Sequence, residues 1–272
     1  MLSISNIAWD ISVDADVVQL LHQYDVTSID IAPSKYFAQP TLVLEHAFEQ
    51  VKQYWHSQGI VLLGMQSLLF GTQGFNLFGR REVRQQMLQH LRSLCRIGNV
   101  LGARKLVFGS PKNRDRAHLN DADTQRIATE FFNQLGDIAQ EQQVVICLEP
   151  SPVCYHSNFM VNTLETAAVV LTVNHPHIRM QLDVGAMCLN QEDARAVIVQ
   201  VAPLVHHIHI SEPQLVPLNS GNTYHEQASQ AIRCYLPDHP VTIEMLTSSP
   251  AHALFEIEQA IQLVQNVYQR RL

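Results

Sequence analysis

The sequence predicts a single (β/α)8 barrel, and three observations lead to this fold class. Strand-like apolar runs alternate with stretches of helical period along the whole 272-residue chain. Eight such strand-like runs can be counted, each followed by a helical stretch. No Pro-, Gly- or Ser-rich linker divides the chain, so one domain over residues 1–272 takes up all eight units. A doubly wound sheet of six strands is the alternative, but it leaves two strands without a place.

The expected strands are short and rich in β-branched and large apolar residues, as buried parallel strands require. They are LSISNIA (2–8), VTSIDIA (26–32), IVLLGMQ (60–66), KLVFG (105–109), VVICLE (144–149), IRMQLD (178–183), LVHHIHI (204–210) and VTIEM (241–245).

The expected helices lie between these strands and show helical spacing of apolar residues. They cover residues 14–24, 41–58, 81–101, 123–141, 163–173, 193–201, 224–235 and 250–270. Asp14 and Asp123 are expected to cap helix N-termini, and Thr163 to open a first turn. Gly59 and Gly102 stand where two helices should end.

Composition indicates a globular protein that does not bind nucleic acid. Hydrophobic residues make up 46% of the chain and charged residues 16%. The formal net charge is -7 and no block of Lys or Arg occurs, which argues against a surface for DNA or RNA. Small metabolites therefore remain the expected partners.

The location expected from sequence is the cytoplasm. The start, MLSISNIAWD, has no basic segment or cleavage site of a signal peptide, and no apolar run reaches the roughly 18 residues of a membrane span. The five cysteines form no CxxC pair, so free thiols in a reducing compartment are expected. A homo-oligomer stays open, because no exposed apolar stripe identifies an interface.

Four consecutive strands carry chemically distinctive residues near their C-terminal ends, where barrel active sites form. These are Glu149, Asp183, His209 and Glu244. If each points into the barrel, its neighbours along the strand point toward the helices, and those neighbours are apolar. The four side chains are therefore expected to converge on one place.

Three carboxylates in one dry site need a counter-charge, and no Lys or Arg occupies these strand ends. A divalent cation provides it, and three oxygen ligands with one nitrogen suit Mn²⁺, Mg²⁺, Co²⁺ or Zn²⁺. Taken singly, each acidic residue could instead be a helix cap or ion-pair member, and the histidine a core residue. His207, one layer deeper, is expected to support the site or the core.

The motifs around these residues resemble those of a known family. The segments ICLEPSP (146–152), QLDVGAM (181–187), HHIHISEP (206–213) and VTIEM (241–245) resemble the xylose isomerase-like TIM barrels. This sugar phosphate isomerase/epimerase superfamily also includes endonuclease IV. The resemblance implies a metal site, usually manganese, on Glu149, Asp183, His209 and Glu244, with the two glutamates acting as acid and base.

Two positions depart from the epimerase members of that family. Ala186 stands where they usually have a histidine, and Tyr155 where they tend to have a second glutamate. Both departures argue against ketose 3-epimerase activity and leave the metal site untouched.

The working hypothesis is an isomerase or epimerase of a sugar or sugar phosphate. Glu149 and Glu244 would transfer a proton next to a carbonyl, with a metal-stabilised enediolate between the two steps. A metal-dependent dehydratase or lyase on a polyol or keto-sugar is an alternative, as is a non-catalytic sugar-binding barrel. An endonuclease IV-like phosphodiesterase fits less well, because it would need further ligands and a basic face.

Six further side chains are expected to contact substrate because they follow or end strands at the barrel mouth. They are Trp9, Gln66, Lys112, Arg114, Glu212 and His225. Lys112 and Arg114 lie in GSPKNRDR (109–116) and could hold a phosphate or carboxylate. A solvated basic loop and aromatic packing are the structural alternatives for these residues.

Overall fold

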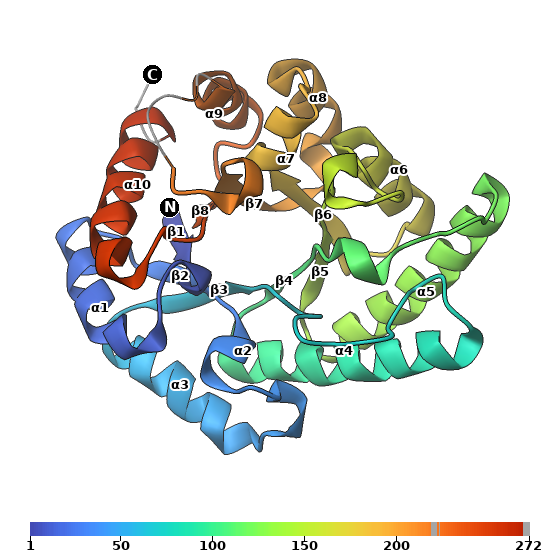
Figure 1. Cartoon of the computed structure of the whole chain (residues 1–272), viewed down its shortest axis with the longest axis horizontal. Helices are drawn as coiled ribbons and strands as arrows, with labels where there is room; N and C mark the ends of the chain where they lie inside the picture. Colours follow the sequence, from blue (N-terminus) through green and yellow to red (C-terminus); the bar gives the residue numbers. More distant parts are fainter. Residues whose placement is uncertain (219–221, 223, 269–272) are drawn as a thin grey trace.

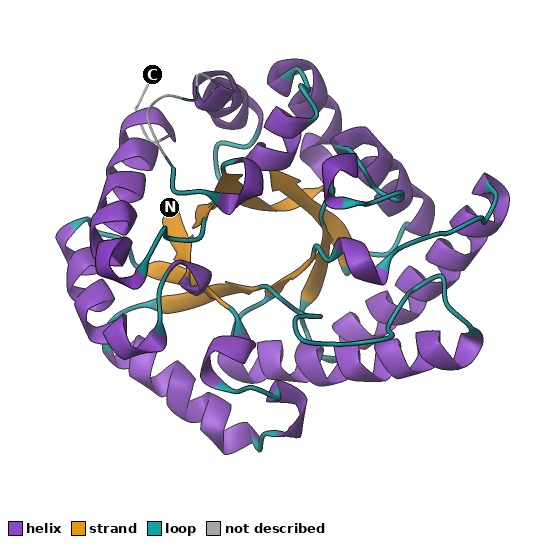
Figure 2. Cartoon of the chain, viewed as in Figure 1, coloured by secondary structure: helices purple, strands orange, loops and turns teal. Residues whose placement is uncertain are grey.

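A computed structural model describes residues 1–218, 222 and 224–268 of the chain. Eight parallel strands close into a barrel in chain order, β1 to β8, with β1 paired to β8. Helices surround the barrel as an outer layer (Figures 1 and 2). The (β/α)8 fold class predicted from sequence is therefore confirmed.

All eight strands coincide with the expected runs, with ends that differ by a few residues. They are β1 (Leu2–Ser5), β2 (Ser28–Ile31), β3 (Val61–Met65), β4 (Lys105–Phe108), β5 (Val145–Leu148), β6 (Ile178–Asp183), β7 (Val205–Ser211) and β8 (Val241–Glu244).

Each expected helical stretch contains a helix, and two short helices were not expected. The helices are α1 (Asp14–Gln23), α2 (Pro33–Tyr36), α3 (Glu45–Ser57), α4 (Arg81–Leu101), α5 (Asp121–Glu141), α6 (Thr163–Val173), α7 (Val184–Leu189), α8 (Ala194–Val201), α9 (Tyr224–Tyr235) and α10 (Ala253–Tyr268). The short ones, α2 and α7, directly follow β2 and β6. The last two positions of the stretch expected at 250–270 lie outside the described residues.

Two predicted helix caps are wrong, and two predicted helix ends are correct. Asp14 is the first residue of α1, and its carboxylate accepts hydrogen bonds from Trp9 and Tyr36 instead of from its own helix. Asn120 caps α5 in place of Asp123, because its side chain accepts a hydrogen bond from the Asp123 amide at 2.8 Å. Gly102 ends α4 with a φ of 78°, a left-handed conformation that glycine adopts without strain.

The main core lies between the barrel and the helices. The strand residues expected to face outward beside the four polar positions, such as Leu148, Leu182 and Ile243, are buried in this core. Inside the barrel, by contrast, buried polar residues recur, including Asp30, Gln181 and His207. Among the described residues, no helix is long and apolar enough to cross a membrane.

Two irregularities in strand pairing adjust which residues face each other inside the barrel. Between β2 and β3 the register shifts after Ile29, so that Asp30 pairs with Gly64. Between β6 and β7 it shifts after Met180, so that Asp183 pairs with His209. Such bulges re-aim side chains near functional sites, and both of these lie beside the residues described next.

Candidate metal centre

The four polar strand-end residues come together as the alternation of the strands predicted. Glu149 directly follows β5, Asp183 ends β6, His209 lies in β7 and Glu244 ends β8. Each offers one ligand atom, and these atoms all lie within 4.8 Å of one another. His209 Nδ1 is 3.1 Å from Glu244 Oε2 and 3.4 Å from Glu149 Oε1.

Glu149 is held between a glycine and a buried arginine. A Cβ atom at Gly109, the residue directly after β4, would lie only 2.0 Å from Glu149 Oε2, so the carboxylate occupies the space that a side chain would fill. Beneath it, the Arg114 guanidinium donates to the backbone carbonyls of Glu149 at 2.7 Å and Gly109 at 2.6 Å. This arginine therefore fixes the ends of β4 and β5 relative to each other.

Asp183 combines two roles, because it ends β6 and caps α7. Its Oδ1 accepts a hydrogen bond from the Ala186 amide at 2.6 Å, and its Oδ2 accepts one from the Ser211 hydroxyl at 2.8 Å. Ser211 in turn accepts a hydrogen bond from the Gly185 amide at 3.0 Å. Both oxygens of the Asp183 carboxylate thus have a fixed orientation and keep lone pairs free for a cation.

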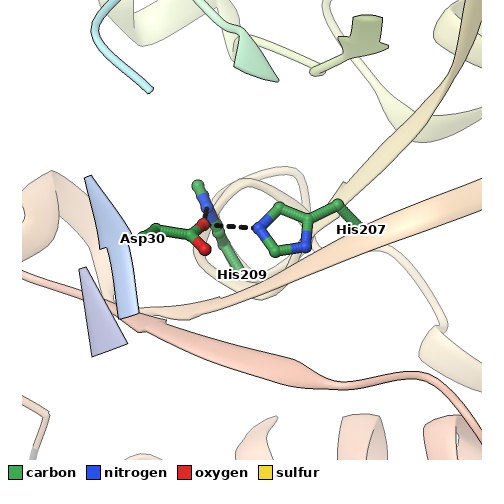
Figure 3. A group of neighbouring side chains, drawn as sticks. All are labelled: Asp30, His207 and His209. Carbon is green, nitrogen blue, oxygen red and sulfur yellow. Dashed lines mark hydrogen bonds and ion pairs between the residues drawn. The ribbon is translucent and has the colours of Figure 1, made fainter. Parts of the chain in front are cut away.

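The remaining two residues also have defined partners. Gln66, just after β3, donates through Nε2 to Glu244 Oε1 at 2.6 Å, which leaves Oε2 of Glu244 directed toward His209. His209 is fully buried, and its Nε2 lies 3.4 Å from Asp30 Oδ2 (Figure 3), whereas Glu149 and Glu244 lie beside its Nδ1.

Crowding of these groups changes their acidities. Burial and the charges of Glu149 and Glu244 raise the pKa of Asp183 to about 7. Burial also raises the pKa of Glu149. Burial opposes protonation of His209, but the surrounding carboxylates, Glu244 first, outweigh it and hold the pKa of His209 well above its usual value.

The residues present fit a divalent cation. Glu149 Oε1 and His209 Nδ1 are buried atoms with no hydrogen-bond partner among the described residues, and both face the centre of the group. The charge of Arg114 acts on Glu149 from below without a direct ion pair, because its nitrogen atoms Nη1 and Nη2 donate to backbone carbonyls. A divalent ion bound by the three carboxylates and the imidazole would give both of these atoms a partner and would also balance the negative charge of the carboxylates.

The centre opens into a large cavity at the barrel mouth. This cavity has a volume of about 1010 Å³, and its lining includes Glu149, Glu244 and Gln66 together with Lys112. A second cavity of about 560 Å³ shares Glu149 and Glu244 and adds Asp183 to its walls. A small molecule can therefore approach the carboxylates from the side of the loops.

Three of the six predicted substrate contacts line these cavities. Gln66 and Lys112 line the larger one, and Glu212 lines the smaller one. Lys112 is exposed and reaches the wall from the loop after β4. Whether these side chains bind substrate stays a prediction.

The other three predicted side chains line neither of these two cavities. Trp9 is 2% exposed and donates to Asp14 Oδ1 at 2.7 Å, so it packs in the core instead of lining a pocket. Arg114 is fully buried, and its guanidinium donates to backbone carbonyls instead of facing a cavity. His225 lies behind Glu212, with Nδ1 2.7 Å from the Tyr268 hydroxyl and Nε2 3.2 Å from Glu212 Oε1.

Sequence reasoning missed residues that support the centre, although signals for two of them were present. Ser211 follows His209 on the same strand face, and Asp30 lies on the inward face of β2, which also carries Ser28. Extending the alternation test to every strand would have found both. The closeness of Gly109 to Glu149 depends on the pairing of β4 with β5 and has no comparable signal in the sequence.

Comparisons with known proteins identify a family and solved structures of similar fold. The model of the family described as xylose isomerase-like TIM barrel matches residues 18–267. A comparison with curated protein sequences finds no match. Among solved structures, D-psicose 3-epimerase, described in the presence of D-fructose, is similar with a TM-score of 0.81 and 14% identity, over 99% of each chain.

Two further solved structures show the same fold likeness. L-ribulose 3-epimerase has a TM-score of 0.81 and 13% identity, over 98% of this chain and 94% of its own. The 3-keto-D-glucoside 4-epimerase of E. coli has a TM-score of 0.76 and 14% identity, over 97% of this chain and 98% of its own. At such identities the likeness concerns the fold.

Proposed function

The chain belongs to the xylose isomerase-like TIM barrel family, and we propose from this premise that it is a divalent-metal-dependent isomerase or epimerase of a sugar or sugar phosphate. The carrying observation is the group formed by Glu149, Asp183, His209 and Glu244, whose ligand atoms lie within 4.8 Å of one another at the base of an open cavity. The sugar epimerases among the similar structures support a sugar as substrate.

These four side chains bind the cation, and Mn²⁺ is the first ion to test. When bound, a divalent ion acts as a Lewis acid that polarises the substrate carbonyl and favours loss of a proton from the neighbouring carbon. Two of these ligands have fixed orientations. Asp183 is held by hydrogen bonds from Ser211 and the Ala186 amide, and His209 is held by its complete burial.

The two glutamates carry the proton transfer. Both Glu149 and Glu244 line the larger and the smaller cavity, so both can face a substrate bound there. One removes the proton next to the carbonyl, and the other returns a proton to the opposite face or to the adjacent carbon. Gln66 holds one oxygen of Glu244 at 2.6 Å and thereby orients the carboxylate for this task.

Substrate contacts beyond the metal are assigned to Gln66, Lys112 and Glu212. Lys112 is suited to a phosphate or carboxylate at the cavity rim, whereas a buried acceptor such as Glu212 is suited to a sugar hydroxyl. Ala186 and Tyr155 line the smaller cavity, and the Tyr155 hydroxyl accepts a hydrogen bond from the Gln214 amide at 2.8 Å. Because these positions lack the His and Glu of the epimerase pattern, keto-glycosides and sugar phosphates belong in the test beside free ketoses.

The test is proton exchange with solvent. Protein loaded with Mn²⁺ is incubated in deuterated water with a panel of aldoses, ketoses, keto-glycosides and sugar phosphates, and deuterium at carbon is read by NMR and mass spectrometry. We expect metal-dependent deuterium incorporation that Glu149→Gln and Glu244→Gln abolish. Undiminished exchange in both variants would contradict the assignment of the two glutamates, and product analysis separates isomerisation from loss of water.

A further inference from the structure

A second polar group lies directly beneath the metal centre, inside the barrel. Asp30 of β2 and His207 and His209 of β7 are each fully buried. His207 Nε2 is 2.5 Å from Asp30 Oδ2, and His209 Nε2 is 3.4 Å from the same oxygen. Figure 3 shows the Asp30 carboxyl group beside the His209 ring, with a dashed contact to His207.

The structure provides space for this carboxylate in a specific way. The register shift between β2 and β3 brings Gly64 opposite Asp30. A Cβ atom at Gly64 would lie 2.7 Å from Asp30 Oδ1 and 2.8 Å from Oδ2. A side chain at this position would therefore displace the carboxylate from the two histidine rings, because real Cβ atoms do not approach so closely.

The donor and acceptor roles in this group follow from its chemistry. An ionised carboxylate only accepts hydrogen bonds, and Asp30 Oδ2 lies within hydrogen-bond distance of the Nε2 atoms of both His207 and His209. Each Nε2 that faces Asp30 must therefore carry a hydrogen. A neutral His209 then has its lone pair on Nδ1, the atom that faces Glu149 and Glu244.

We propose that Asp30 is a positioning residue that acts through His209: it keeps the hydrogen on Nε2 and thereby presents Nδ1 to the metal. His207 holds Asp30 in place through the shorter contact. This inference rests on the proposed metal function, because it assigns a partner to one of its four ligands. Partners of this kind orient a ligating histidine and strengthen metal binding.

A second metal ion within the trio is the competing interpretation, since the same three side chains could in principle ligate. The distances argue against it. Two donors on one ion, with bonds of about 2.0–2.2 Å, stand roughly 3 Å apart, whereas His207 Nε2 and Asp30 Oδ2 are at a hydrogen-bond separation of 2.5 Å. These contacts favour a hydrogen-bonded support for a single centre, and the number of ions bound per chain tests this interpretation.

The first experiment measures Mn²⁺ affinity and stoichiometry by electron paramagnetic resonance titration in wild type, Asp30→Asn and Asp14→Asn. Asparagine keeps the shape of Asp30, but its amide can donate to Nε2 and so allow the hydrogen on Nδ1. We expect one ion per chain and binding that is 10- to 100-fold weaker in Asp30→Asn. Asp14 is also a buried carboxylate but contacts Trp9 and Tyr36, so Asp14→Asn should bind as wild type does.

The second experiment reads the hydrogen position directly in the wild-type chain. In protein labelled with ¹⁵N-histidine and loaded with diamagnetic Mg²⁺, the His209 signals are assigned by their loss in His209→Gln. We expect hydrogen on Nε2 and none on Nδ1. This measurement needs no folded Asp30 variant.

The outcomes separate the two proposals. Three results would each overturn the role of Asp30 but not the four-ligand centre. They are equal Mn²⁺ affinity in wild type and Asp30→Asn, a hydrogen on His209 Nδ1 in the metal-loaded wild type, and two bound ions per chain of which Asp30→Asn loses one. A wild type that binds no divalent ion would overturn both. If urea unfolding shows Asp30→Asn to be less stable than wild type while its Mn²⁺ affinity is unchanged, Asp30 has a structural role only.

Discussion

Replacement of Gly109 by alanine should disable the metal centre through one methyl group. The added Cβ would lie 2.0 Å from Glu149 Oε2 and 3.1 Å from its Cδ. An unstrained contact needs about 3.5 Å, so the carboxylate has to retreat by roughly 1.5 Å. The clash is steric only, because Gly109 is not among the residues with positive φ.

The expected magnitude follows from that displacement. Misplacement of a reacting group by about 1 Å lowers turnover about 100-fold, and an overpacked site costs about 1–3 kcal/mol of stability. We therefore expect Gly109→Ala to lower turnover about 100-fold and to weaken Mn²⁺ binding at least 10-fold. Metal titration, steady-state turnover and urea unfolding measure the three effects.

A matched control separates the loss of the centre from overpacking in general. At Gly136 in α5, an added Cβ would lie 2.4 Å from the ring of His175, which precedes β6 and so lies at the opposite end of the barrel. Gly136→Ala should lose stability and keep its metal affinity. If Gly109→Ala bound Mn²⁺ as tightly as wild type and turned over normally, Glu149 would not be a metal ligand and the reasoning would be refuted.

Further predictions concern Asp183, Arg114 and Lys112. Without metal, the free energy of unfolding should fall as pH rises from 3.8 to about 7, because the raised pKa of Asp183 makes the folded state hold a proton that the unfolded chain releases. Urea unfolding with chelator should show a flatter pH dependence in Asp183→Asn. Arg114→Met should cost about 2–4 kcal/mol of stability, since two buried carbonyls lose their donor; a surface-like change below about 0.5 kcal/mol would contradict its structural role. Lys112→Ala should leave stability unchanged and raise KM for a phosphorylated substrate, and an unchanged KM would remove Lys112 from the binding site.

The fold could be predicted from sequence because its signals are local and repeated. Each strand is a short apolar run and each main helix has its own period, so errors at one boundary do not affect the count. Helix caps were harder to predict, because they depend on competition between nearby side chains. Asp14 illustrates this: its carboxylate is taken by Trp9 and Tyr36, and the latter comes from the next βα unit.

The candidate site could be predicted only where strand alternation determines direction. Glu149, Asp183, His209 and Glu244 were found in this way and do lie together. Loop residues have no such period, and Lys112 and Arg114 show the consequence. They are two positions apart in one basic loop, yet Lys112 is exposed at the cavity and Arg114 is fully buried beneath Glu149.

The stability of the folded chain depends on whether the centre holds a metal ion. The raised pKa of Asp183 weakens the metal-free folded state, and so do the buried atoms of Glu149 and His209 that have no hydrogen-bond partner among the described residues. An ion that binds only the folded chain stabilises it by about 2.7 kcal/mol at 100 times its dissociation constant. Residues that hold the ligands in place, among them Asp30, therefore preserve an arrangement that destabilises the folded state without metal and stabilises it when a cation is bound. For this reason a neutral variant such as Asp183→Asn should be more stable than wild type without metal at pH 7, and less stable than wild type with it.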